Sequence, residues 1–335
     1  MPKFLIGIDI GTTLVKAVLI TDCCEKLASW EIEYPIYHPH AGWAEQNADD
    51  WWNASVTVLS KIASEAKKMG GEISALYISS QTPTMLPLDE HGTPIRNAMI
   101  WMDRRAEKEV RFVTDKVGFE RYRQIIKKPP DASGMLHKFL WYKNNEPDNY
   151  KKTKKILMTN TYVIYKLTGK MVCDHGSASL VQAFDEELQC WSEEVAGAVD
   201  VPLADYFPPI LNALDIAGET NKEASEKTGL PAGIPVFTGS TDVVPGSVAT
   251  GIYKPGQAAE TTGTSTLVFF ASNKKVIDGR GFLTQEYYAE AVPTVLFGAI
   301  NSTGASLKWY ATKLGQAESI AADIEGASEI GRAHV

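Results

Sequence analysis

The chain has 335 residues, of which 33 are Lys or Arg and 41 are Asp or Glu, so its formal net charge is −8. A chain of this length buries substantial cores and favours two domains. The acidic balance argues against nucleic acid or an anionic membrane as a partner, so phosphorylated ligands would have to be bound by local donors.

The cysteines and the N-terminus indicate the compartment. Cys23, Cys24, Cys173 and Cys190 have no metal-ligand spacing, and the adjacent pair cannot easily form a disulfide, which predicts reduced thiols in a cytoplasmic protein. The first three residues run straight into an apolar segment, and no apolar run reaches about 18 residues. We therefore expect no signal peptide and no membrane span.

The first apolar segment, residues 4–20, reads FLIGIDIGTTLVKAVLI. Its two β-branched runs predict two strands joined by a turn at Gly11, Thr12 and Thr13. The amides and hydroxyls of such a turn form a concave site for an anion, which predicts phosphate binding. Asp9, next to the turn, is a candidate to hold Mg²⁺ or its waters. The alternative is a tight hairpin with an acidic neighbour and no ligand.

The next elements predict a sheet covered by a helix. Strands are expected at Leu27–Tyr34 and Ile73–Ser80, and between them a helix that Asn47 or Asp49 caps and that ends at Gly70–Gly71. Gln81 and Thr82 follow the second of these strands, at the carboxyl end where ligands collect in α/β sheets, so they are predicted to donate to a substrate.

The middle of the chain is predicted to be mainly helical. The expected elements are a helical region at 107–146 broken at Pro129–Pro130, a strand at Ile156–Met158, a helix at Thr161–Leu167, a loop at 174–177, an extended segment at 201–217 and a helix at Asn221–Thr228.

Residues 98–105, AMIWMDRR, are predicted to form a strand or turn before a charged helix. Trp101 offers a flat face for the C–H side of a sugar, and Asp103 can accept two hydroxyl hydrogen bonds. The alternative is that Asp103 only caps a helix that starts at Arg104. Arg104 and Arg105 are expected to orient Asp103 or to form surface ion pairs.

Asp242 is the candidate catalytic residue. Residues 235–238 are predicted to form a strand, 239–241 a tight turn and 243–250 a helix, which places Asp242 near a helix N-terminus. There it either caps the helix or serves as the base that accepts a substrate hydroxyl proton. The helix dipole is predicted to lower the pKa of Asp242.

A second Gly-Thr turn occurs in residues 260–270, ETTGTSTLVFF, at Gly263, Thr264 and Ser265. A weak internal duplication of this kind is what a two-sided phosphate clamp would need. The sequence has no P-loop motif, and no Gly-x-Gly-x-x-Gly opens a helix. A nucleotide site would therefore use hairpin turns. Lys16 is predicted either to pair with phosphate or to lie at the sheet edge.

Five segments occur in the order and spacing of the FGGY carbohydrate kinases, namely GIDIGTT, WMDRRA, GSTDVVPGSVATG, TTGTST and NSTGASLKWY. From residue 4 to about residue 315 the chain resembles the xylulokinase-like branch of that family. The resemblance implies an α/β fold of two ribonuclease H-like domains, of the actin and sugar-kinase type, with ATP and sugar meeting between them. It also implies Mg²⁺, Asp242 as the base, and Gly304 and Lys308 near the nucleotide.

The resemblance further implies a division of the chain. Residues 1–250 would form the N-terminal domain for sugar and phosphate, and residues 251–328 part of a C-terminal nucleotide-binding domain. Residues 329–335, EIGRAHV, look like the translation of a sequencing-adapter end, so the chain is expected to be truncated.

The expected function is ATP-dependent phosphorylation of a sugar or polyol hydroxyl. Xylulose is the first candidate, with glycerol, ribulose, gluconate or a deoxy-sugar as alternatives, because Thr82–Pro83 stands where xylulokinase-like enzymes often carry Met-His. An actin- or chaperone-like ATPase and a catalytically silent sugar-binding relative remain the two other classes. A homodimer, common in the family, is a further expectation.

Overall fold

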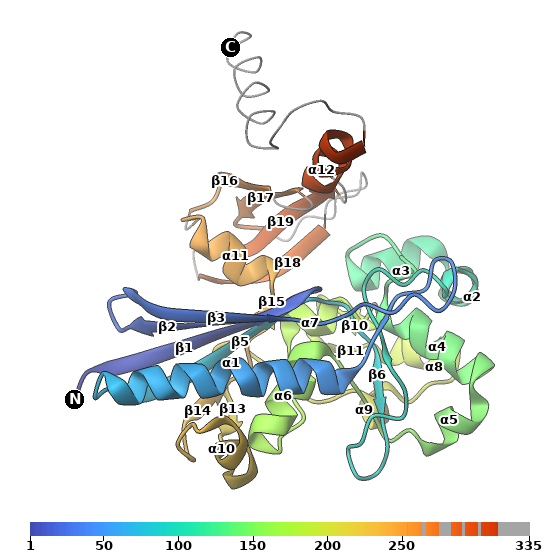
Figure 1. Ribbon diagram of the computed structural model, residues 1–335. Coiled ribbons are helices and arrows are strands. Elements are labelled where there is room, and N and C mark those ends of the chain that lie inside the picture. The colour runs from blue at the N-terminus through green and yellow to red at the C-terminus, as the bar shows by residue number, and fades with distance from the viewer. Residues whose placement is uncertain (253, 263–265, 275–282, 290–291, 301–302, 314–335) are drawn as a thin grey trace. The chain divides into compact units, whose positions relative to one another are not determined.

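The computed structural model describes residues 1–252, 254–262, 266–274, 283–289, 292–300 and 303–313. It contains two compact units, Met1–Gly246 and Ser247–Val335, which run from blue to orange and from orange to red in Figure 1. Helix α11 (Val243–Ala249) crosses the boundary between them. All candidate residues of the predicted sugar site belong to the first unit.

The first unit is built on a seven-stranded mixed sheet in the order β13-β14-β5-β1-β2-β3, and β15 also pairs with β5. Strands β1, β2 and β3 are antiparallel neighbours, whereas β5 pairs in parallel with β1, β14 and β15. The strands are β1 (Lys3–Ile10), β2 (Leu14–Thr21), β3 (Lys26–Glu33), β5 (Glu72–Ser80), β13 (Ile216–Glu219), β14 (Pro235–Phe237) and β15 (Ser240–Thr241).

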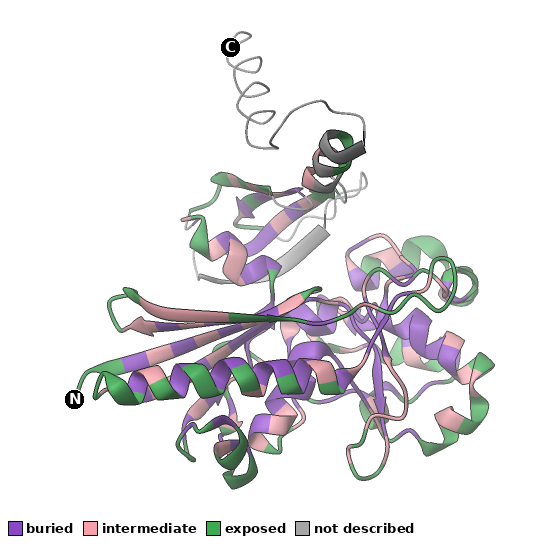
Figure 2. Cartoon of the chain, in the orientation of Figure 1, coloured by how far each residue is buried: buried purple, intermediate pink, exposed green. Residues whose placement is uncertain are grey.

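Helix α1 (Ala48–Lys68) covers one face of this sheet (Figure 1). Every second residue of β1 is buried, from Phe4 to Ile10, and α1 is buried at helical spacing, which Figure 2 shows as purple bands. Asn47 caps the helix by accepting a hydrogen bond from the Asp49 amide, 3.0 Å away. The predicted strands and helix of this region are therefore confirmed. They could be predicted because their apolar patterns are set by residues close together in the sequence.

The remaining helices of the first unit pack on that core or form a second one. Helices α6 (Thr159–Thr168) and α10 (Lys222–Thr228) contact α1. The other helices are α2 (Glu107–Val117), α3 (Phe119–Ile126), α4 (Met135–Asn145), α5 (Pro147–Lys152), α7 (His175–Ser179), α8 (Glu193–Val199) and α9 (Leu203–Tyr206). Short strands pair as β4 (Glu45–Gln46) with β7 (Ala98–Met99), β6 (Leu86–Leu88) with β8 (Lys155–Leu157), β9 (Cys173–Asp174) with β12 (Ile210–Leu211), and β10 (Phe184–Asp185) with β11 (Cys190–Trp191).

Three local predictions were wrong. Ser240 and Thr241, expected in a tight turn, form β15 because they pair with Ser79 and Ser80 of β5. The expected loop at 174–177 contains the end of β9 and the start of α7, which Asp174 caps through the Ser177 amide at 3.0 Å. The expected extended segment at 201–217 includes the one-turn helix α9.

The second unit contains a four-stranded antiparallel sheet in the order β16-β17-β19-β18. Its elements are β16 (Ala258–Thr262), β17 (Thr266–Ser272), β18 (Leu283–Ala289), β19 (Val292–Ile300) and helix α12 (Gly304–Lys313). Within the described ranges, none of the helices has the length and apolar character needed to cross a membrane.

Candidate functional site

A row of polar residues crosses the sheet where β1, β5 and β15 end. Asp9 lies in register with Ser79 on one side and with Lys16 on the other, and the row continues to Ser240 and Glu31. Residues in register share a face of the sheet. Lys16 is exposed and its Nζ lies 3.4 Å from a Glu31 carboxylate oxygen. The expected place at the sheet edge was wrong, because β2 pairs with β1 on one side and with β3 on the other. The row therefore brings one carboxylate, Asp9, next to the turn.

One carboxylate oxygen of Asp9 accepts a hydrogen bond, and the other is available to a ligand. Ser79 Oγ donates to Oδ1 at 2.6 Å, and a Cβ built on Gly11 would lie 3.9 Å from Oδ2. Burial raises the pKa of Asp9, while the Ser79 hydrogen bond and the charge of Lys16 oppose the rise. Oδ2 accepts no hydrogen bond from the described residues, and carboxylate oxygens are ligands that Mg²⁺ prefers.

No group of three His, Cys, Asp or Glu residues gathers around a common point in the described part of the chain. A single carboxylate such as Asp9 is still compatible with magnesium, because Mg²⁺ keeps several waters and often binds one or two carboxylates together with substrate phosphates. Asp9 Oδ2 is the oxygen placed for such contact, either directly or through a bound water.

The predicted turn joins β1 and β2 as expected, but one of its backbone amides is already used within the hairpin. The Gly11 amide donates to Leu14 O at 2.9 Å, so this amide is used by the hairpin and is not available to an anion. Trp101 Nε1 donates to Thr12 Oγ1 at 3.0 Å, which leaves the Thr12 hydroxyl hydrogen for an acceptor on a ligand. Thr13 is exposed at the end of the turn.

Asp242 lies directly after β15. Its amide donates to Ser80 O at 2.9 Å and its carbonyl accepts from the Gly246 amide at 3.1 Å, so it stands at the N-terminus of α11 as predicted. The side chain is exposed to solvent, but the surrounding protein still disfavours its charge. This desolvation, with the charge of Asp9 as the second cause, raises the pKa of Asp242 to about 7.

The prediction that the pKa of Asp242 is lowered was therefore wrong. The amides of Val243 and Asp242 do lower it, but desolvation and the neighbouring carboxylate outweigh them. A carboxylate with a pKa near 7 is better suited to accept a proton at neutral pH than one with the usual value.

Gln81 lies at the end of β5, where sequence reasoning placed it. It is 1% exposed, and its Nε2 donates to Gln46 Oε1 at 2.6 Å. Gln46 Nε2 in turn donates to Thr12 O at 2.6 Å, so Gln81, Trp101 and Thr12 belong to one connected set. Thr82 follows Gln81 and is half-buried.

Gln46 was not among the predicted site residues. A signal for it was present, because the neighbouring Trp51 is fully buried and its indole N–H needs an acceptor, which Gln46 Oε1 provides at 3.0 Å.

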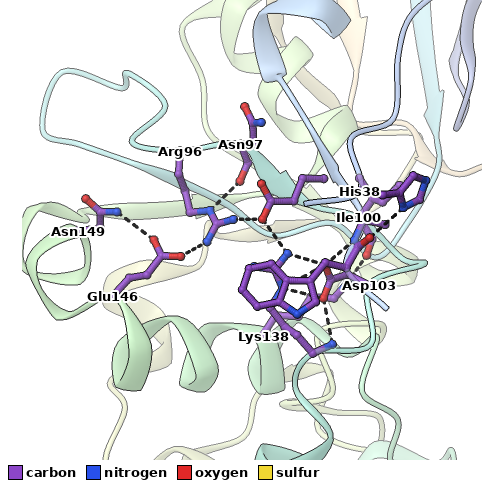
Figure 3. A network of polar contacts seen from close by, with 12 residues as sticks. His38, Arg96, Asn97, Ile100, Asp103, Lys138, Glu146 and Asn149 are labelled. Atoms are coloured by element: carbon purple, nitrogen blue, oxygen red, sulfur yellow. Dashed lines mark hydrogen bonds and ion pairs between the residues drawn. The ribbon is translucent and has the colours of Figure 1, made fainter. Parts of the chain in front are cut away.

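Asp103 is completely buried, at 0% exposure, and its oxygens are occupied by protein donors. Ala44 N donates to Oδ2 at 2.7 Å, and Arg105 donates through its amide, Nε and Nη2 at 2.7 to 3.1 Å. Figure 3 shows Asp103 within this network. The geometry favours a role in positioning the Trp101 loop over direct contact with a sugar.

The cap alternative for Asp103 was wrong, since α2 begins at Glu107 and has no side-chain cap. The expected roles of the arginines are confirmed. Arg105 orients Asp103 and also donates to Glu45 at 2.7 Å, whereas Arg104 forms an exposed pair with Asp131 at 2.6 Å. Arg105 additionally stacks 3.5 Å from the centre of the Trp43 ring.

Lys138 is a second residue that the sequence did not single out. It is fully buried, and its Nζ donates to Ile100 O at 2.7 Å (Figure 3) and to Pro83 O at 3.3 Å. Burial lowers the pKa of Lys138 to about 7, against the opposing charge of Asp103. Lys138 thus ties the segment after β5 to the segment that carries Trp101.

The candidate nucleotide-binding residues of the second unit are only partly within the described residues. Gly304 begins α12 and Lys308 lies within that helix. Gly263, Thr264 and Ser265 lie outside the described residues, so the expected two-turn phosphate clamp stays a prediction. Thr262 and Thr266, which flank them, are paired across β16 and β17.

Comparison with known proteins gives consistent results. Residues 4–249 match the FGGY family of carbohydrate kinases, N-terminal domain. The chain is 27% identical over 328 residues to "Xylulose kinase" of Bacillus subtilis (strain 168), covering 98% of this chain and 65% of that protein. It is also 27% identical over 319 residues to "Glycerol kinase" of Thermococcus kodakarensis, covering 92% of this chain and 62% of that protein.

Among solved structures, xylulose kinase from Rhodospirillum rubrum superposes with a TM-score of 0.89 at 24% identity, over 96% of this chain and 65% of that one. A likeness at this identity establishes the fold, which is the expected α/β sugar-kinase type. The chain spans somewhat less than two thirds of the length of these relatives.

Proposed function

Because the chain belongs to the FGGY family of carbohydrate kinases, we propose that it carries the sugar-binding domain of an ATP-dependent kinase that phosphorylates a hydroxyl group of a sugar or polyol. The observation that carries the proposal is the pairing of two carboxylates, Asp9 and Asp242, on either side of the β5 end, with the pKa of Asp242 raised to about 7. Phosphoryl transfer to an alcohol needs both a metal ligand and a proton acceptor.

In this proposal each residue has a separate task. Asp242 accepts the proton of the attacking hydroxyl, and Thr12 and Thr13 donate to phosphate oxygens of ATP. Gln81, Thr82 and Trp101 contact the sugar, and Asp103 acts through Arg105 and Ala44 to hold the Trp101 loop. Mg²⁺, held through Asp9, would neutralise phosphate charge.

The second unit is proposed to bind the nucleotide through Gly263, Thr264, Ser265, Gly304 and Lys308, and Lys16 remains a candidate partner of phosphate. Xylulose is the first candidate substrate, and glycerol, ribulose, gluconate and a deoxy-sugar are the alternatives. A cytoplasmic location and a homodimer complete the proposal.

The test measures ADP formation, by this chain and by any longer protein that contains it, over a panel of ketoses, polyols and aldonates. We expect Asp242→Asn to lower sugar-dependent turnover by about 10²–10⁴ while sugar binding is retained. The rate of the unmutated protein should rise with pH up to about 7, where Asp242 loses its proton.

Each rival class predicts another result. ADP formation that does not depend on any sugar would favour an ATPase of the actin or chaperone type. Sugar binding without ADP formation, in a protein as long as the relatives, would favour a silent sugar-binding protein. Near-normal turnover of Asp242→Asn would remove Asp242 from the role of base.

A further inference from the structure

Gln81 presents one hydrogen-bonding atom without a partner. Its side chain is 1% exposed, its Nε2 is bonded to Gln46, and its Oε1 is buried and accepts no hydrogen bond from the residues that the structure describes. A buried acceptor without a donor is costly, and native proteins rarely retain one without a reason. Gln81 was placed in the sugar site on separate grounds, by its position at the carboxyl end of β5.

The orientation of the Gln81 amide is fixed by its neighbours. Trp51 Nε1 can only donate, so the Gln46 atom that it contacts at 3.0 Å must be Oε1. Thr12 O can only accept, so the Gln46 atom at 2.6 Å from it must be Nε2. Gln46 therefore offers an oxygen to Gln81, and Gln81 has to turn its NH₂ group towards Gln46.

This chain of amides makes Gln81 Oε1 an obligate acceptor. Turning the Gln81 amide over would bring two carbonyl oxygens together at 2.6 Å and would cost the hydrogen bond to Gln46. A ligand in contact with Oε1 must therefore bring a hydrogen-bond donor.

We infer that the substrate places a hydroxyl group against Gln81 Oε1 as a donor, and that the site discriminates at that position against groups that only accept. The inference rests on the proposed sugar-binding function and narrows its substrate class. A ketone, a carboxylate or an ether oxygen is excluded from that one position, whereas any polyol or sugar with a free hydroxyl there fits. Gln46 is the positioning residue that sets this preference.

The test uses this chain and compares binding of D-xylulose, glycerol and D-gluconate by calorimetry. For the tightest of the three, each hydroxyl is then replaced singly by hydrogen and by fluorine. Fluorine accepts weakly and cannot donate. At one position we expect both replacements to weaken binding about 10- to 100-fold, because each leaves Oε1 without a donor.

Two variants connect that position to the amide chain. In Gln81→Met the same two analogues should bind within about threefold of the parent sugar, since no acceptor is left unpaired. In Gln46→Met the Gln81 amide can turn over and present its NH₂ group to the ligand. The binding affinity of the fluorine analogue, which can accept weakly, should then recover more than that of the deoxy analogue. Gln124→Met, at an exposed glutamine of α3, is the matched control and should leave the pattern unchanged.

The outcomes distinguish failure of the inference about Gln81 from failure of the proposed sugar-binding function. Fluorine tolerated at every position of a sugar that binds would overturn the inference, because it would mean that Gln81 donates or that a water lies between. Failure of every sugar and polyol to bind would overturn the proposed function, and the inference with it. The analogue series on the unmutated chain does not depend on whether a variant folds.

Discussion

Arg104 and Arg105 are neighbours in the chain, but only Arg105 is buried. The Arg105 side chain is 1% exposed and pairs with Asp103 at 0%, whereas Arg104 and its partner Asp131 are 46% and 40% exposed. Arg105→Ala and Arg104→Ala therefore remove the same charge from two different environments. We expect Arg105→Ala to be the far more destabilising of the two.

The loss of unfolding free energy in Arg105→Ala can be worked out from the contacts that remain. Without the Arg105 side chain, Asp103 keeps only the amides of Ala44 and residue 105 as donors, and Glu45 keeps Arg96. Breaking a buried pair costs about 3–5 kcal/mol. Arg105 Nη1 is itself buried and has no hydrogen-bond acceptor among the described residues, and its removal offsets about 1 kcal/mol. The expected loss of unfolding free energy is thus about 2–4 kcal/mol, against less than about 1 kcal/mol for the exposed Arg104 pair.

Urea denaturation followed by tryptophan fluorescence and by circular dichroism measures both values, and agreement between the two probes checks for two-state unfolding. Asp103→Asn adds a second comparison. If Asp103 only positions the Trp101 loop, this variant should lose stability even without sugar. Equal stability of the two Arg→Ala variants would refute the assignment of Asp103 and Arg105 as a buried structural pair.

Two further predictions concern stability. Because the pKa of Lys138 falls from 10.5 to about 7 on folding, the unfolded chain binds more protons between these values, and the unfolding free energy should rise with pH there by up to about 1.4 kcal/mol per pH unit. Between pH 7 and pH 9.5 the urea midpoint should rise less for Lys138→Met than for the unmutated chain. An equal rise in both proteins would contradict the lowered pKa of Lys138. Gly239 has φ +71° and its added Cβ would lie 1.9 Å from Ile78 O, so Gly239→Ala should cost more than about 2 kcal/mol. Gly246→Ala in α11, where a Cβ meets nothing within 4 Å, should be neutral or stabilising, and urea denaturation of the two variants measures both effects.

The parts of the fold that depend on nearby residues could be predicted from the sequence. The hairpin of β1 and β2 and the cap of α1 at Asn47 follow from apolar alternation and turn chemistry within a few residues. Strand β15 could not be predicted in this way. Its two residues carry no pattern of their own and become a strand only by pairing with β5, about 160 residues earlier in the chain.

The same distinction holds for the site. The positions of Gln81 after β5 and of Asp242 at the start of α11 could be predicted, because they follow from local strand and helix signals. The raised pKa of Asp242 could not, because its causes are desolvation by the surrounding protein and the charge of Asp9, which lies far away in the sequence. Gln46 and Lys138 were missed for a related reason, since their importance lies in the buried carbonyls and amides that they reach.

The late position of β15 in the chain has a consequence for biosynthesis. The first hairpin is complete once about 20 residues have left the ribosome, whereas the strand that carries Asp242 into place is made only after some 240. Through most of translation Asp9 therefore lacks Asp242 as an acidic neighbour. The electrostatic repulsion between these two carboxylates can arise only after residue 242 has been made, so a nascent chain arrested before residue 240 should lack it.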